Sequence, residues 1–194
     1  MKKNQLYGKW IEVELRPDKF WVIIESVLWV RPTGEKVFLT PYFITDYATT
    51  PRPIRSIFPR RSNTYDIAAA FHDDCIVKGR LQGITNNPAC HRIFNELAKK
   101  YGTPSWQRFL MYRSVQVYGI AQVLRLSLMP DKDYAKYFGW KLTPQEIYRY
   151  NKIIRKTKHI QQKTLTSELP EMNVNERTTY KYDEFTSLYK PSCA

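Results

Sequence analysis

The stretch Ile67-Ala-Ala-Ala-Phe-His-Asp-Asp-Cys-Ile-Val77 marks the change from a strand-like to a helical hydrophobic pattern. On a helix, these residues place apolar side chains around nearly the whole circumference, and a helix that is apolar all round is usually buried. His72 and Asp73 are therefore expected to enter the interior or the floor of a cleft. Buried charges are rare unless they are paired or bind a metal ion, so both side chains need partners.

Partners for these two side chains are expected from other parts of the chain. Adjacent residues on a helix do not face one another, so Asp73 is not expected to orient His72 directly. Asp46 follows a predicted strand, and His91 lies in the first turn of a later predicted helix. Both are therefore candidate partners of His72.

Two antiparallel helices could bring His72, Cys75, Cys90 and His91 together, and these are ligand types that suit zinc, although their spacing matches no common zinc motif. In a metal site, the ligands of zinc or another divalent ion would be His72, His91 and Asp46. In a catalytic site, the candidates are His72 as general base, Asp46 to fix its tautomer, and Asp73. The structural alternative is a set of buried hydrogen bonds that tie a loop to the helix.

The residues before this stretch predict strands. Trp10–Leu15 alternate between apolar and polar side chains, and Phe20–Val30 are rich in β-branched and aromatic residues. Arg31-Pro32-Thr33-Gly34 predicts a turn, after which Glu35–Thr40 return as a third strand. We expect a small antiparallel meander.

The residues that follow predict helices, whose starts are marked by capping residues or prolines. The expected helices run from Tyr65 to about Lys78, from Pro88 to Tyr101, from Thr103-Pro104 to before Pro130, and from Thr143-Pro144-Gln145-Glu146 into Lys152–Lys158. In the third, apolar residues including Trp106 and Leu110 repeat at helical spacing, as in an amphipathic helix. The predicted fold class is α+β, with a small N-terminal antiparallel sheet packed on three to four helices.

From Gln161 onward the composition shifts to Thr, Ser, Glu and Asn, which cannot support a core of its own. We expect one domain over residues 1–160 and a polar, extended C-terminal arm over residues 161–194. The aromatic and apolar side chains of the arm are expected to anchor it to a partner or a neighbouring subunit: Tyr180, Tyr182, Phe185, Leu188 and Tyr189.

The chain has 31 Lys and Arg residues against 18 acids, a net charge of +13. This excess favours acidic partners such as nucleic acid, a phosphate-rich surface or an acidic protein face, or it serves solubility alone. A proline-rich segment concentrates positive charge, and this basic loop could bind phosphate or carboxylate groups or simply be solvated. Its arginines are Arg52, Arg55, Arg60 and Arg61.

Three cysteines (Cys75, Cys90 and Cys193) make an odd count without a dense framework, which favours a reducing compartment over a secreted disulfide scaffold. The N-terminal residues lack the uninterrupted apolar segment of a signal peptide. No run of 18 or more apolar residues occurs, so no membrane span is expected.

Several stretches together resemble the phage and prophage family called domain of unknown function 1353. They are Phe43-Ile-Thr-Asp-Tyr-Ala-Thr-Thr-Pro51, Ala68–Asp73, Phe94 and Tyr112–Gly119, which follow the family pattern Phe-x-Thr-Asp-x-Ala-Ser-x-Pro and then His-Asp. The resemblance implies a tailed-phage setting and no particular reaction. Thr49 replaces the family serine, and Cys75-Ile76 replaces Leu-Tyr.

A further departure is Cys90-His91, which stands where the family has Ala-Asp. If the family site binds a metal, His91 could replace the acid as ligand; if the family uses the acid as a base, activity would be lost here. The run His72-Asp-Asp-Cys75 also resembles the catalytic helix of phospholipase A2, in which the histidine activates water and the aspartate binds calcium. This chain lacks that family's glycine-rich calcium loop and its many disulfides.

Three functions are left open. The first is a tailed-phage virion structural or interaction protein, made in the host cytoplasm, associated with tail, neck or capsid, and docked onto other virion proteins through its arm, with several copies in a symmetric assembly as one option. The alternative is a metal- or His-dependent hydrolase acting on a host polymer, peptidoglycan or lipid. The third is a nucleic-acid binder that uses the basic loop.

Overall fold

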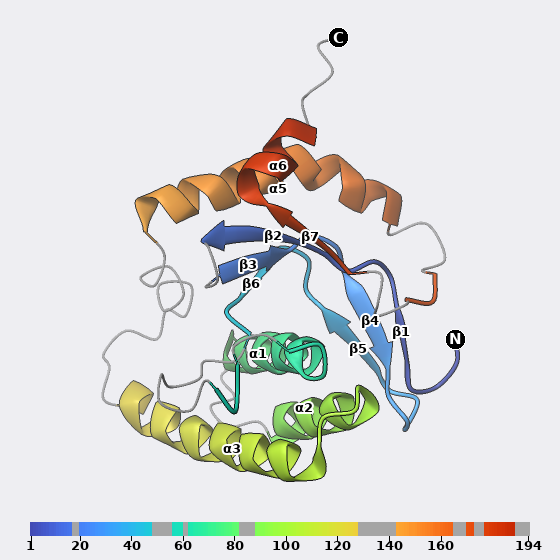
Figure 1. Cartoon of the computed structure of the whole chain (residues 1–194), viewed down its shortest axis with the longest axis vertical. Helices are drawn as coiled ribbons and strands as arrows, with labels where there is room; N and C mark the ends of the chain where they lie inside the picture. Colours follow the sequence, from blue (N-terminus) through green and yellow to red (C-terminus); the bar gives the residue numbers. More distant parts are fainter. Residues whose placement is uncertain are drawn as a thin grey trace. The chain divides into compact units, whose positions relative to one another are not determined.

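The computed structural model describes residues 1–16, 20–47, 56–59, 62–81, 88–127, 143–164, 170–172 and 177–188. Its contacts divide the chain into two compact units. The first unit joins Met1–Asp46 to Gly139–Ala194, and the second is Tyr47–Phe138. Strands at the N-terminus and helices after them confirm the α+β class (Figure 1).

The strands of the first unit form two sheets, with the orders β1-β4-β5 and β6-β3-β2-β7. All strand pairs are antiparallel except β2 with β7, which is parallel. The strands are β1 (Gln5–Tyr7), β2 (Ile11–Arg16), β3 (Phe20–Ile23), β4 (Val27–Val30), β5 (Lys36–Leu39), β6 (Phe43–Thr45) and β7 (Thr178–Lys181). The single meander predicted from the sequence is therefore divided between two sheets.

The division occurs where two segments of the chain bend against each other. The expected strand Phe20–Val30 is interrupted at Ile24–Ser26, and its two halves, β3 and β4, belong to different sheets. The chain also changes sheet between β1 and β2, at Gly8, whose φ is 110°. A Cβ on Gly8 would lie 2.8 Å from the backbone oxygen of Ser26. Only glycine tolerates both this φ and this close approach, so Gly8 allows the two bends to meet.

Among the described residues, four helices begin at the predicted signals, and a fifth, α6, lies in the segment that was expected to be an extended arm. They are α1 (Asp66–Leu81), α2 (Pro88–Lys100), α3 (Ser105–Ser127), α5 (Pro144–Thr164) and α6 (Tyr182–Leu188). The backbone N–H of Thr143 donates to Glu146 Oε2 at 2.5 Å, and the Glu146 N–H donates to Thr143 Oγ1 at 3.3 Å, as a capping box requires. In the part of the chain that is described, no helix is long and apolar enough to cross a membrane.

The described C-terminal residues are part of the first unit and not an arm that leaves it. Gly8 N donates to Pro170 O at 2.8 Å, and Met172 N donates to Leu6 O at 2.8 Å. β7 then pairs with β2, and α5 and α6 pack on β2 as well (Figure 1). The contacts therefore do not divide the chain at residue 160, because its end returns to the N-terminal strands.

The burial of Phe185 explains why the C-terminal segment stays attached to the N-terminal strands. The Phe185 side chain is fully buried in a cluster with residues of β2, β3 and α5 and with Ile24, which follows β3: Val13, Leu15, Phe20, Val22, Ile24 and Ile153. Tyr180 and Tyr182 are partly buried against the same cluster. The prediction that Phe185 anchors a partner is therefore wrong, because a segment too polar for a core of its own completes the core of the N-terminal strands. Leu188 ends α6, and Tyr189 lies outside the described residues.

A buried carboxylate secures the same return of the chain. Glu12, on β2, is fully buried. Trp10 Nε1 donates to its Oε2 at 2.9 Å, and Thr179 Oγ1 donates to its Oε1 at 2.7 Å. Arg177 Nη2 lies 3.9 Å from Oε2. These partners compensate for the cost of burying the charge and connect β2 to the chain at β7.

Candidate functional site

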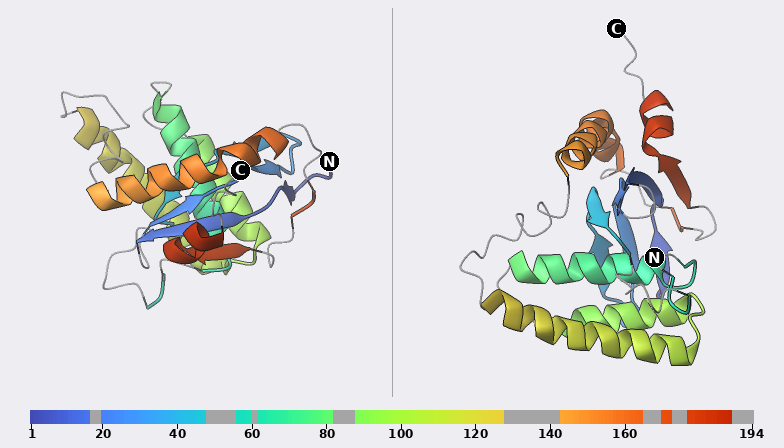
Figure 2. Two further views of the ribbon diagram at one scale, coloured as in Figure 1. Left: turned by 90° about the horizontal axis from the view of Figure 1, so that it is seen from above. Right: turned by 60° about the vertical axis from the view of Figure 1, so that its left-hand side comes forward.

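The candidate site lies on α1 and α2, two helices of the second unit that pack side by side (Figure 2). The residues that open α1, Ile67–Phe71, are all buried, as the apolar circumference predicted. On α2, Ile93, Phe94 and Leu97 form a buried apolar face. Gly102, with a φ of 78°, ends this helix in the left-handed conformation that glycine favours. Both helices are thus held firmly enough to position polar side chains between them.

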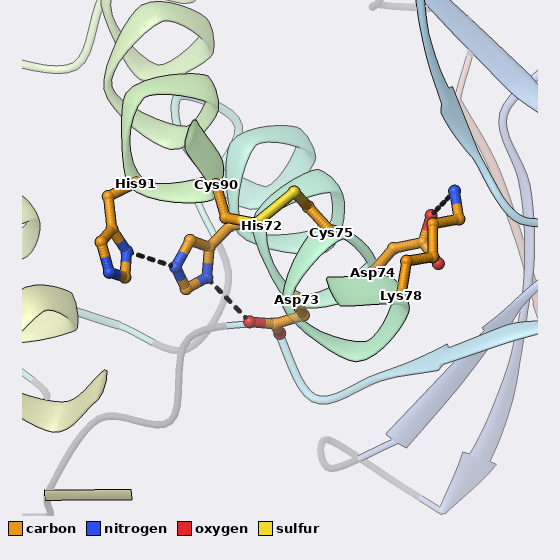
Figure 3. The surroundings of a disulfide bond; sticks show 7 residues. All are labelled: His72, Asp73, Asp74, Cys75, Lys78, Cys90 and His91. Atoms are coloured by element: carbon orange, nitrogen blue, oxygen red, sulfur yellow. Dashed lines mark hydrogen bonds and ion pairs between the residues drawn. A yellow bond between two sulfur atoms is a disulfide. The ribbon is translucent and has the colours of Figure 1, made fainter. Parts of the chain in front are cut away.

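A disulfide between Cys75 and Cys90 joins the two helices, whose Cα atoms are 5.5 Å apart at these positions (Figure 3). In a simple chain-entropy model, closing a loop of this length stabilises a fold by roughly 3 kcal/mol. The odd cysteine count did not predict this bond. Sulfurs bonded to each other are not thiolate ligands, so the structure does not support a zinc site built on these cysteines. Cys193 lies outside the described residues.

Next to the disulfide, two imidazoles and a carboxylate form a continuous chain of contacts (Figure 3). His72 Nε2 lies 3.1 Å from His91 Nδ1, and His72 Nδ1 lies 3.1 Å from Asp73 Oδ1. The two imidazole rings are inclined by 28°, with centroids 5.3 Å apart, and the edge of Phe94 packs against His72. His72 is 9% exposed and His91 is 4% exposed, so the pair is largely shielded from water. We call Asp73, His72 and His91 the relay.

The contact between His72 and Asp73 corrects the expectation that neighbours on a helix do not meet. The Cα–Cβ bonds of the two residues do leave the helix in different directions. However, Nδ1 is the ring nitrogen nearer the main chain, and the Asp73 side chain turns back toward it (Figure 3). The next acid, Asp74, points away from the relay and forms an ion pair with Lys78 at 2.6 Å. Asp73 therefore lies where it can orient the His72 ring and fix its tautomer.

The proton positions in the relay follow from what each atom can donate. An ionised carboxylate only accepts hydrogen bonds, so His72 Nδ1 carries a hydrogen and donates it to Asp73. In neutral His72, Nε2 then has a lone pair, which accepts the Nδ1–H of His91. This assignment leaves a lone pair on Nε2 of His91 at the far end of the relay. Nε2 of His91 is therefore the proton acceptor that the contacts within the relay leave unused.

Burial, and to a lesser extent the neighbouring charge of His72, together lower the pKa of His91 to about 4. Two adjacent imidazoles that interact this strongly titrate as a pair and do not readily hold two protons. The first proton is best placed on His72, where the Asp73 carboxylate stabilises the cation. A proton that enters through His91 can thus be passed to His72, so that the charge does not stay on buried His91.

Asp46 and the arginines of the basic loop were also predicted for the site. Asp46 is half-buried and follows β6 in the first unit, and its role stays a prediction. Among the described residues, no group of three or more His, Cys, Asp or Glu side chains could hold a metal ion. Zinc or another divalent ion stays a prediction for His72, His91 and Asp46. The arginines of the basic loop (Arg52, Arg55, Arg60 and Arg61) lie outside the described residues.

Residues 21–115 match the model of a family described as a protein of unknown function, DUF1353. The resemblance to DUF1353 is thus confirmed over just under half of the chain. This stretch contains the relay and the disulfide, whereas α5, β7 and α6 lie outside it. Searches of curated proteins and of solved structures find no match. The match to this family therefore does not indicate which reaction, if any, the site carries out.

The pKa of His91 predicts a pH dependence for the stability of the protein. An unfolded His91 takes up a proton below about pH 6.5, whereas the folded one does so only below about pH 4. Between these values the unfolded state binds more protons, so acid favours unfolding. The free energy of unfolding is expected to lose about 3 kcal/mol through this group as the pH falls from 7 to 4, and to lose no more below that. Urea denaturation at a series of pH values measures this loss.

A matched pair of variants isolates the contribution of His91. His91→Gln should remove about 3 kcal/mol from the difference in stability between pH 7 and pH 4. Tyr148→Phe, at an exposed position on α5 in the first unit, should leave that difference as it is in the unaltered protein. An acid dependence that is the same in all three proteins would show that His91 is not the responsible group.

Proposed function

We propose that this protein is a hydrolase in which the relay acts as a general base. The observation that carries the proposal is the unbroken line from the Asp73 carboxylate through His72 to His91, with both contacts at 3.1 Å. General bases in enzymes combine a group that accepts the proton with a second group that orients it and stabilises its charge. In the relay, these tasks fall to His91 and to Asp73, and His72 connects them.

The proposed proton transfer balances at every step. Nε2 of His91 takes a proton from water, while the Nδ1 proton of His91 moves to Nε2 of His72. The water oxygen forms a bond to the acyl carbon of an ester or amide, and the electron pair of the C=O π bond moves to the carbonyl oxygen, which becomes an oxyanion. The positive charge now lies on His72, 3.1 Å from Asp73. When this oxyanion re-forms the C=O bond, the bond to the leaving oxygen or nitrogen breaks, the proton returns to that atom through His91, and the relay recovers its starting form.

The relay resolves a difficulty that His91 alone would present. A base whose pKa is about 4 is weak at neutral pH, because the charge it would acquire is buried beside His72. When the Nδ1 proton of His91 passes to His72, the positive charge moves next to the carboxylate of Asp73. The basicity that matters is then the basicity of the coupled pair, not that of His91.

The structural alternative assigns the relay only the task of holding α1 to α2. The Cys75–Cys90 bond already performs that task, three residues after His72 and one residue before His91. A second link between the helices through two buried imidazoles costs free energy, because both polar rings lose their contact with water, and it adds little to the attachment of α1 to α2. This redundancy favours a chemical role for the relay.

The test is hydrolysis by the purified full-length chain of a chromogenic carboxylic ester, of phospholipid vesicles and of peptidoglycan. We expect turnover of at least one substrate, with loss of activity in His72→Gln and in His91→Gln. His159→Gln serves as a matched control for loss of an imidazole and should remain active. Absence of turnover on all three substrates, or full activity in His72→Gln, would overturn the proposal. Circular dichroism checks that each variant is folded.

The role as a tailed-phage virion protein is a second proposal, and it rests on the family resemblance. Docking through the C-terminal segment now needs residues other than Phe185, which is buried in the chain's own core. The proposal predicts that the protein is found in purified particles. Its absence from particles that are otherwise complete would count against it.

A further inference from the structure

One face of α3 carries large apolar side chains that contact water. Trp106, Phe109 and Leu110 are 56%, 57% and 45% exposed, and Arg113 is exposed as well. The spacing of these residues (i, i+3, i+4 and i+7) places them on the same side of the helix. The amphipathic pattern of this helix would normally bury such a stripe. Its exposed position is therefore a departure that needs an explanation.

A neighbouring loop extends this face. Gln107 Nε2 donates a hydrogen bond to the backbone oxygen of Ile57 at 3.1 Å. The rings of Phe58 and Trp106 are in contact, with 6.0 Å between their centroids. Ile57 is thereby held beside the start of α3, with its side chain 52% exposed. We call Ile57, Trp106, Phe109, Leu110 and Arg113 the α3 face. All five residues belong to the second unit.

The charge of this face has one sign. The guanidinium of Arg113 lies over the ring of Phe109, 5.5 Å from its centroid. Ser105–Ser127 contain Arg108, Arg113 and Arg125 and no Asp or Glu. The chain as a whole carries a net charge of +13. A surface with apolar anchors and only cationic charge on its helix is complementary to an apolar layer bordered by anions.

We propose that the α3 face docks onto the surface of an anionic lipid bilayer. Aromatic and aliphatic side chains on one side of a helix insert at the boundary between head groups and acyl chains. Arg113, one turn from Phe109, then lies at the level of the lipid phosphates. The helix would lie in the plane of the interface and would not cross it. This binding does not depend on the relay being catalytic.

The size and charge of the α3 face favour a bilayer over a protein partner, a second copy of the chain or a nucleic acid. A stable protein interface buries about 800 Å² on each partner and involves roughly 20–30 residues a side, far more than the α3 face provides. A bilayer needs no matching shape, so a few anchors suffice. In a symmetric pair of chains, Arg113 would approach its own copy without an acid on either helix. A nucleic acid would be bound mainly by cationic side chains that contact its phosphates, and not by large apolar side chains.

Binding to vesicles tests the proposal. The full-length chain is mixed with vesicles of phosphatidylcholine alone or with about one third phosphatidylglycerol, and the bound fraction is measured by sedimentation. We expect binding to the anionic vesicles that weakens with salt. Phe109→Ser and Trp106→Ser should each weaken binding about 10- to 100-fold, as expected when a large apolar side chain no longer enters the bilayer. Arg113→Gln should weaken binding to anionic vesicles more than to neutral ones.

Two controls separate this result from general effects. Phe38→Ser removes a phenylalanine that is 49% exposed on β5, in the other unit, and should bind as the unaltered protein does. His72→Gln should also retain binding, which distinguishes loss of docking from loss of hydrolysis. Failure to sediment with anionic vesicles would overturn the proposal. Equal losses in Phe38→Ser and Phe109→Ser would overturn it as well.

Discussion

Asp73→Asn is expected to slow hydrolysis about 10²- to 10³-fold while the protein stays folded. The asparagine oxygen can still accept the Nδ1–H of His72, so the geometry of the relay survives. The negative charge that stabilises protonated His72 is lost, however, and the relay becomes a weaker base. Initial rates over a range of pH measure the effect, and the loss should be present across the whole range in which the unaltered protein is active.

Asp74→Asn is the matched control for this change. Asp74 is the next residue on the same helix, and it pairs with Lys78 instead of the relay (Figure 3). Because its side chain is buried, its replacement should lower the free energy of unfolding. The rate for the folded protein should stay within about twofold of the unaltered rate. If both variants lose activity equally, the carboxylate of Asp73 has no special part in the reaction.

The second large effect is on stability. Phe185→Ala is expected to lower the free energy of unfolding by about 3–5 kcal/mol, as is typical when a fully buried phenylalanine is truncated in a core. Phe185 contacts a cluster that includes Val13 and Leu15 of β2, so its loss leaves a cavity between α6 and the sheet. Unfolding in urea, followed by circular dichroism, measures the change.

Tyr148→Ala provides the comparison, because Tyr148 lies on α5 in the same unit and is 65% exposed. This change should alter the free energy of unfolding by no more than about 0.5 kcal/mol. If Phe185→Ala proves as stable as Tyr148→Ala, Phe185 is not part of the core. The earlier interpretation of Phe185 as an anchor for a partner would then return.

The sequence by itself determined the features that depend on neighbouring residues. The capping box of Thr143 and Glu146, the proline at the start of α2 and the turn at Arg31–Gly34 all occur where they were predicted. Each is set by hydrogen bonds and backbone angles within a few residues, which a linear pattern contains. The α+β class follows from the same local patterns.

Only the tertiary structure decided the features that join distant residues. Gly8 meets Ser26, Phe185 fills a core made by β2 and β3, and the side chains of the relay come from two helices. The polar composition of the C-terminal segment correctly excluded a core of its own, but composition cannot indicate which other core a single phenylalanine completes. The orientation of Asp73 toward His72 depends on its side-chain rotamer (Figure 3), and periodicity does not contain that choice.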